Sequence, residues 1–197
     1  LGTQMIAKGL DFPNVTLVGV IDADIGINLP DFRASERTFQ LMSQVAGRAG
    51  RGPKGGEVVI QTRVPGHHAV RHAAAHDFLA FVAEEMPARE SPPYPPTLRI
   101  ANVVLSGLDE VAVADFARHV TGWLVEADTR FSLDVTVLGP APCPIERIKT
   151  RFRWHAILKS MQSAPLTRLI RGLMGGVEVP SAGEMRLVVD RDPVSLL

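Results

Sequence analysis

The sequence predicts a mixed α/β protein of two domains, on two observations. Residues 91–97, SPPYPPT, contain four prolines, which exclude helix and block the hydrogen bonds of a strand ladder. We therefore expect a first domain over residues 1–90, a linker over residues 91–97 and a second domain over residues 98–197. The first domain shows the order strand, helix, strand, whereas the second alternates strands and helices in the order β-α-β-β-α-β.

The first domain is predicted to contain a βαβ crossover. Residues 15–22, VTLVGVID, form an apolar run that is typical of a strand covered on both faces of a parallel sheet. A helix is expected from about Ala34 to the glycines that begin at Gly47, and the next strand begins at Glu57. A further helix from about residue 67 to residue 85 would lead into the linker. The inward face of the first helix is predicted to consist of Phe39, Met42, Val45 and Ala46.

The second domain is predicted to be an α+β sandwich of the ferredoxin-like type, with two helices on one antiparallel sheet. Strands are expected at residues 98–105, 133–137, 152–158 and 185–189, where apolar residues alternate with others. Asp109 is expected to cap the first helix. The inward face of that helix is predicted to be Val113, Phe116, Ala117, Val120 and Leu124, and that of the second helix Leu166, Leu169, Ile170, Leu173 and Val177.

The composition is that of an ordinary folded protein, with 46% hydrophobic and 21% charged residues. No apolar run reaches the ~18 residues that cross a bilayer, so we expect a soluble, cytoplasmic protein with no membrane partner. Lys+Arg and Asp+Glu are balanced at 21 each, so nucleic-acid binding would have to come from local clusters. Cys143, the single cysteine, is expected in a loop and excludes an internal disulfide. The opening LGTQMIAKG has no initiator Met and no signal-peptide core, which suggests a cut within a longer protein.

One amide and two guanidiniums are predicted to share a helical stripe in the run QVAGRAGRG, residues 44–52. On a helix, Gln44, Arg48 and Arg51 are spaced i, i+4 and i+7 and lie on the same side. Guanidinium is permanently charged and forks onto phosphate oxygens, which suits it to the charge on a transferring phosphoryl group. The alternative is a helix C-terminus whose arginines only offset the helix dipole, worth about 0.3–1 kcal/mol each.

Histidines also gather in the first domain. On a helix, His68, His72 and His76 recur at i, i+4 and i+8 beside His67, which could offer metal ligands on one face. The tract is rich in alanine and has no evident acidic ligands beside it. A solvated helix face is therefore the favoured interpretation, and no metal site is predicted.

A basic stretch in the second domain predicts a surface for DNA or a protein partner. Residues 147–171 contain no acidic residue, although the net charge of the chain is zero. If residues 147–159 run extended, their basic residues share one parity and form a row on one face, which could follow a phosphate backbone. The alternative is a solvated sheet face. The predicted set is Arg147, Lys149, Arg151, Arg153, Lys159, Arg168 and Arg171.

These runs resemble those of a known family. The run 44–52 resembles motif VI of superfamily 2 helicases, and residues 2–13, GTQMIAKGLDFP, resemble motif V as it occurs in the PriA (primosomal protein N-prime) family. Residues 31–37, 151–154 and 189–193 are also similar to that family. The resemblance implies that the first domain is part of the second RecA-like helicase lobe, and that the chain is the C-terminal part of a 3′–5′ DNA helicase acting in replication restart and primosome assembly.

The resemblance also implies ligands, partners and residue roles. Gln44, Arg48 and Arg51 would contact the phosphates of ATP, with Arg51 as the first choice for an arginine finger. ATP and Mg²⁺ would be the cofactors of the intact enzyme, with zinc only in an upstream segment. The partners would be forked and single-stranded DNA, the single-stranded-DNA-binding protein and other primosome proteins. The residues coupling ATP to DNA would be Gly2, Thr3, Gln4, Lys8 and Asp11.

The sequence contains no GxxxxGK[ST] phosphate loop, and Lys54 in GPKGG has the wrong spacing to replace it. We therefore expect this chain alone to be inactive toward ATP. The alternative function is a noncatalytic adaptor that binds DNA or a replication protein and retains helicase motifs only as relics.

Overall fold

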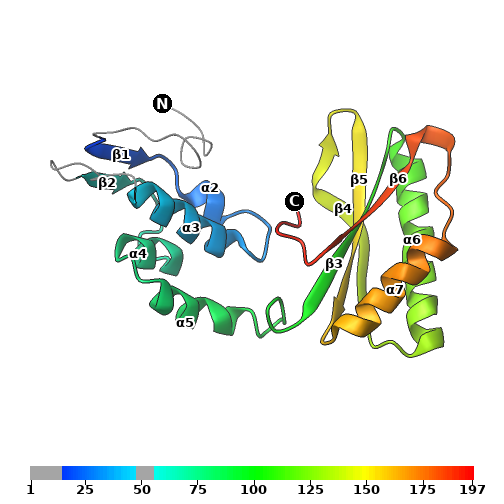
Figure 1. Cartoon of the computed structure of the whole chain (residues 1–197). Coiled ribbons are helices and arrows are strands. Elements are labelled where there is room, and N and C mark those ends of the chain that lie inside the picture. The colour runs from blue at the N-terminus through cyan, green and yellow to red at the C-terminus, as the bar shows by residue number, and fades with distance from the viewer. Residues whose placement is uncertain (1–14, 48–55) are drawn as a thin grey trace. The chain divides into compact units, whose positions relative to one another are not determined.

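The computed structural model of the protein describes residues 15–47 and 56–197. The chain divides into two compact units, Leu1–Ser91 and Pro92–Leu197 (Figure 1). The division falls inside the proline-rich segment 91–97, where prolines supply no backbone N–H for a ladder or a helix.

The first unit is built on a pair of parallel strands joined through helices. β1 (Leu17–Val20) pairs with β2 (Glu57–Ile60), with Leu17 opposite Glu57 and Val20 opposite Ile60. Between these strands in the chain lie α2 (Asp24–Ile27) and α3 (Ala34–Ala46). Parallel neighbours need such a crossover connection, so the predicted strand, helix, strand order is confirmed.

The expectation that β1 is covered on both faces is wrong for this chain. Alternate residues of the two strands are exposed, and Leu17 and Val59 keep 61% and 52% of their surface in solvent. The other face packs on a cluster that includes Phe39 and Met42 of α3, two residues correctly predicted to face inward. Only this face of the sheet is covered by a helical layer of the described chain. Val45 and Ala46, also expected inward, are half-buried.

The single helix predicted over residues 67–85 is two helices. α4 (His68–Ala74) and α5 (Phe78–Ala88) are separated by a turn. His76 in that turn has a φ of 53°, a left-handed conformation that ends a helix. Asp77 then begins the next one, because its carboxylate accepts from the N–H of Ala80 at 2.9 Å.

The second unit has the predicted succession β-α-β-β-α-β, with β3 (Arg99–Gly107), α6 (Glu110–Phe131), β4 (Thr136–Ile148), β5 (Arg151–Ser160), α7 (Ser163–Gly176) and β6 (Arg186–Arg191). A short 3₁₀ turn, η1 (Ala182–Glu184), precedes β6. The sheet has the order β4-β5-β3-β6, and all neighbouring strands are antiparallel. β3, the first strand of this unit in the chain, therefore lies inside the sheet between β5 and β6.

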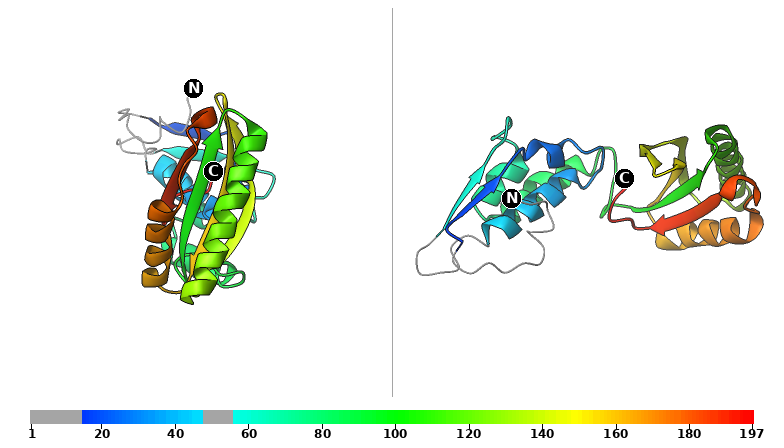
Figure 2. Two further views of the ribbon diagram at one scale, coloured as in Figure 1. Left: turned by 90° about the vertical axis from the view of Figure 1, so that its right-hand side faces the viewer. Right: turned by 90° about the horizontal axis from the view of Figure 1, so that it is seen from above.

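Both helices of the second unit pack on one face of its sheet, as Figures 1 and 2 show. All five residues predicted to form the inward face of α6 are buried, and so are Leu166, Leu169 and Leu173 of α7. They meet the alternate residues of β3 and β5 that point to this face. The predicted capping of α6 is confirmed, since the Asp109 carboxylate accepts from the N–H of Ala112 at 2.9 Å. None of the helices in residues 15–47 and 56–197 is long and apolar enough to span a lipid bilayer.

The predicted strand over residues 133–137 is placed too early. Leu133 and Val135 are buried but precede β4, which begins at Thr136 and continues to Ile148 with two shifts in its pairing with β5. These irregularities carry the strand through a proline-rich sequence that predicts a loop. Cys143, expected in that loop, is instead a buried strand residue, and its burial raises the pKa of its thiol.

The cap of α6 gives a direct test of its contribution to stability. Replacing Asp109 with Ala should lower the free energy of unfolding of the chain by about 1 kcal/mol, because the first turn loses its side-chain acceptor. Urea denaturation followed by circular dichroism measures this. The matched control is Asp115→Ala on the same helix, whose exposed ion pair with Arg118 should contribute less than about 0.5 kcal/mol. Equal losses in the free energy of unfolding would contradict the expectation that the cap stabilises the chain more than the exposed ion pair does.

Candidate functional site

The helix that leads into the predicted phosphate-contacting run ends before the two arginines. α3 ends at Ala46, where the N–H of Gly47 donates to the carbonyl of Ser43 at 3.0 Å. Gln44 is exposed in the last turn of α3. The other predicted residues of the ATP and coupling site lie outside the described residues: Arg48, Arg51, Gly2, Thr3, Gln4, Lys8 and Asp11.

The start of α3 is fixed by charge and by an aromatic stack. Before the helix, the Asp31 carboxylate pairs with Arg37 at 2.6 Å, and its side chain is fully buried. Within the helix, the ring of Phe39 stacks on Phe81 of α5 with centroids 4.3 Å apart. These contacts hold the direction of the helix that ends next to the glycine and arginine run.

A buried arginine joins α3 to α5. The Arg89 guanidinium donates to Glu36 of α3 at 2.9 Å and to Glu85 of α5 at 2.9 and 3.0 Å. It also lies 5.7 Å from the ring of Phe32. The side chains of Arg89 and Glu85 are each only 9% exposed, so each charge depends on the other for the interaction that water would otherwise supply. Removal of one partner would leave an uncompensated charge inside this unit.

The histidines do not form the solvated helix face that the sequence favoured. His68 Nε2 contacts the Glu85 carboxylate at 2.6 Å, and His72 Nε2 contacts Glu84 at 2.8 Å. His76 lies in the turn between α4 and α5, so the i, i+4, i+8 spacing of the three histidines does not continue along one helix. The acidic partners come from α5, a separate helix whose packing the periodicity of one helix cannot predict. In the described part of the chain no three His, Cys, Asp or Glu side chains come together as a metal site.

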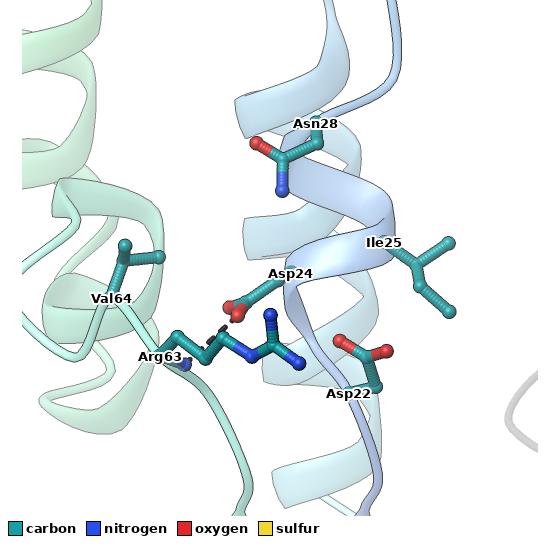
Figure 3. Close-up of a pocket in the computed structure, with 6 residues that line it drawn as sticks. All are labelled: Asp22, Asp24, Ile25, Asn28, Arg63 and Val64. Atoms are coloured by element: carbon teal, nitrogen blue, oxygen red, sulfur yellow. Dashed lines mark hydrogen bonds between the residues drawn. The ribbon is translucent and has the colours of Figure 1, made fainter.

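A pocket of about 440 Å³ lies beyond the carboxyl ends of β1 and β2 (Figure 3). Asp22, Asp24 and Asn28 line it from the β1 side, and Arg63 and Val64 line it from the β2 side. Figure 3 shows the Arg63 side chain extending toward the segment that carries the two aspartates. Sequence reasoning missed this pocket. Its signal was the place of Asp22 at the carboxyl end of the strand predicted over residues 15–22, since ligands of open α/β sheets bind beyond the carboxyl ends of strands.

Asp24 is held in its charged form by the neighbouring segment. Its carboxylate accepts from the Thr62 hydroxyl and from the N–H of Arg63, the latter at 2.9 Å. The hydroxyl first, and then the backbone N–H, hold the pKa of Asp24 below its ordinary value of 3.8. Asp24 therefore joins the ends of the two strands and is a structural member of the pocket.

The basic residues of the second unit do not form the predicted single row. The chain reverses between β4 and β5, with Ile148 opposite Arg151, and Lys149 in the turn has a φ of 57°. Residues 147–159 therefore do not run as one strand. Arg151 donates to Glu184 at 3.0 Å and is mostly buried.

Lys159, also expected in that row, is buried inside the second unit. Its Nζ donates to the carbonyl of Pro93 at 3.2 Å and lies 3.6 Å from the centre of the Tyr94 ring. Burial lowers the pKa of this lysine. Lys159 and Arg151 are thus internal contacts, contrary to the prediction that they face a partner.

Five members of the predicted basic set remain without a carboxylate partner among the described residues. Arg153 donates to the carbonyl of Ile145 at 3.2 Å. Arg147 lies over the ring of Phe152 at 4.9 Å, and Arg168 lies over the ring of Phe131 at 5.0 Å. The set that keeps a charge available to a ligand is Arg147, Lys149, Arg153, Arg168 and Arg171.

Residues 91–194 match the model of the family described as Primosomal protein N C-terminal domain, and the chain belongs to this family. The chain is 45% identical over 174 residues to the replication restart protein PriA of Bacillus subtilis, an alignment that covers 88% of this chain and 21% of the relative. It is 38% identical over 197 residues to that of Treponema pallidum, with 100% and 29% covered. With the Rickettsia conorii protein, identity is 37% over 190 residues, with 96% and 28% covered.

The chain thus spans less than a third of the length of these relatives. The similarity extends across both units, because each alignment covers most of the chain. Membership in a family of replication restart proteins is consistent with the predicted link to DNA replication and the primosome.

The hydrogen bond from the Thr62 hydroxyl to Asp24 predicts that its removal changes the pKa of Asp24. Replacing Thr62 with Val should raise the pKa of Asp24 toward 3.8, because the largest contribution to its lowering is lost. A carboxyl ¹³C NMR titration measures this, with Thr129→Val on α6 as the matched control. Since the folded-state pKa lies below the unfolded one, the contribution of Asp24 to stability is present at neutral pH. It is lost as pH falls through the folded-state value. An Asp24 pKa that is equal in all three proteins would contradict this assignment.

Proposed function

We propose that this chain is the C-terminal part of an ATP-dependent 3′–5′ DNA helicase that acts in replication restart at stalled forks. The observation that carries the proposal is the similarity of both units to replication restart proteins, at 37–45% identity over most of the chain. That similarity includes the glycine and arginine run at the end of α3, which resembles helicase motif VI.

We assign the first unit to the second RecA-like lobe. In support, β1 and β2 are parallel and are connected through α3, as expected for a piece of an α/β sheet covered by helices. The exposed face with Leu17 and Val59 is where further layers of a complete lobe would pack.

We assign the second unit to the ferredoxin-like architecture. The support is its topology, in which two β-α-β halves interleave in the antiparallel order β4-β5-β3-β6 and both helices cover one face. This architecture serves many functions, so the role of the unit depends on its surface.

The donor set at the end of α3 fits the phosphates of ATP and does not fit Mg²⁺. An amide at Gln44 and guanidiniums at Arg48 and Arg51 are hydrogen-bond donors for anionic oxygens, whereas Mg²⁺ requires oxygen ligands of negative or partial negative charge. In the intact enzyme Arg51 would stabilise charge on the transferring γ-phosphoryl group, with Arg48 and Gln44 beside it. The phosphate loop, the Mg²⁺ ligands and the zinc-binding cysteines would belong to upstream parts of that protein.

The second unit would bind DNA or an acidic protein segment through the basic side chains that its own structure leaves available. These are Arg147, Lys149, Arg153, Arg168 and Arg171. Cations of this kind follow a phosphate backbone with an affinity that falls as salt rises. The acidic tail of the single-stranded-DNA-binding protein is a protein ligand of matching charge, and other primosome proteins would assemble on the same complex.

The decisive experiment replaces Arg51 with Ala in the full-length protein. ATP turnover in the presence of forked DNA should fall by about 10³-fold, because an arginine finger acts mainly on the transition state. Affinity for the DNA should change little. The matched control is Arg118→Ala, an exposed arginine on α6 that should leave turnover unchanged.

Near-normal turnover of the Arg51 variant would remove that residue from the phosphate site. The adaptor alternative makes a different prediction, because a full-length protein of that kind would bind DNA without DNA-stimulated ATP turnover in any variant.

A further inference from the structure

The pocket beyond the carboxyl ends of β1 and β2 contains polar side chains that the fold itself does not use. In the part of the chain that the structure describes, the side chains of Asp22, Asn28 and Arg63 form no hydrogen bond or ion pair. Asp24, in contrast, already accepts from the Thr62 hydroxyl and from the backbone N–H of Arg63. The pocket therefore offers one carboxylate, one amide and one guanidinium to a ligand (Figure 3).

The charges of the pocket disfavour both an anion and a metal ion as its ligand. Asp24 is held in its charged form, so the carboxyl groups of Asp22 and Asp24 stand against the single guanidinium of Arg63, which disfavours phosphate. The guanidinium in turn disfavours a cation, and no cluster of His, Cys, Asp and Glu side chains suited to a metal ion occurs within residues 15–47 and 56–197. A neutral ligand that both donates and accepts hydrogen bonds fits these groups.

The pocket also has apolar lining. Ile25 and Val64 contribute to its wall and keep 64% and 43% of their surface in solvent. Apolar side chains of this kind pack on the faces of a nucleobase, while polar groups bind its edge. The volume of about 440 Å³ lies within the range of about 300–1,000 Å³ that is usual for sites of small organic ligands. A flat heterocycle with a hydrogen-bonding edge therefore matches the lining, the charge and the volume.

We propose that this pocket binds one unpaired base of a DNA strand, with Asp22 accepting from the base and Asn28 and Arg63 donating to it. The inference rests on the proposed DNA helicase function. Each of the four bases carries both a donor and an acceptor on its Watson–Crick edge, so the pocket does not require one sequence. That edge is free only in an unpaired base, so the pocket favours single-stranded DNA over duplex.

The first test compares the affinity of the full-length protein for oligothymidine and for a chain of abasic sites of the same length, which keeps the phosphates and lacks the bases. Arg63→Ala should weaken binding of oligothymidine by about tenfold, the effect of losing a hydrogen bond from a charged group. It should leave binding of the abasic chain within about twofold of wild type, because no phosphate contact is lost. Arg71→Ala is the control, since it removes the same charge from an exposed ion pair outside the pocket and should change neither affinity by more than about twofold.

The second test uses the sign of an effect to separate a base contact from a backbone contact. Asp22→Asn keeps the shape of the side chain, and Asn tolerates the left-handed φ of 52° at this position. Loss of the charged acceptor should weaken binding of oligothymidine by about threefold or more and leave the abasic chain unaffected. A contact with phosphates predicts the opposite, because removal of a nearby carboxylate would strengthen binding of both chains. Circular dichroism checks that each variant is folded.

The outcomes separate the inference from the proposed function. If Arg63→Ala weakens binding of the two chains equally, or leaves binding of oligothymidine as in wild type, the inference is overturned and the helicase function stands. Stronger binding of both chains by Asp22→Asn overturns it in the same way. If the wild-type protein binds neither chain, the proposed function itself fails.

Discussion

The second unit depends on one apolar seam between its sheet and its two helices. Alternation along β3 and β5 places Ala101, Val103 and Leu105 together with Ala156 and Leu158 on a single face, where α6 and α7 cover them. Both helices of the described unit pack on this one face of the sheet. Polar groups on the opposite face must therefore find partners within the sheet or in the chain that precedes it, as Asn102 and His155 do at 3.1 Å and Lys159 does at Pro93.

The first unit is organised differently because it has less apolar surface to bury. Its cluster is smaller, and one face of its two-stranded sheet stays in solvent. The direction of α3 is consequently fixed by paired charges as well as by packing, with Arg89 between two carboxylates and Asp31 on Arg37. Paired buried charges add little net stability, but each needs its partner in place, because a buried charge left alone is strongly unfavourable. That property would suit the proposed role of α3, whose end would present side chains to a phosphate.

Local sequence patterns predicted an element correctly where the structure of that element depends on its own residues. The inward face of α6 and its cap at Asp109 follow from spacing and from the chemistry of a helix start. Predictions were wrong where the structure depends on a contact with a distant segment or on an unusual backbone conformation. The left-handed His76 divides the expected helix, and the turn at Lys149 divides the expected basic row. Arg151 and Lys159 have partners 33 and 66 residues away, which no local periodicity contains. Spacing and guanidinium chemistry drew attention to Arg48 and Arg51, and the resemblance supplied their expected roles. The pocket at Asp24 depends on two strands meeting and was not predicted.

We propose that the run after α3 contacts the phosphates of ATP in an intact two-lobed enzyme. The most direct measurement is a structure of the full-length protein bound to forked DNA and a nonhydrolysable ATP analogue. We expect a guanidinium nitrogen of Arg51 within hydrogen-bond distance, about 2.7–3.2 Å, of a γ-phosphate oxygen. A γ-phosphate held entirely by other residues, with Arg48 and Arg51 both turned toward solvent, would contradict it.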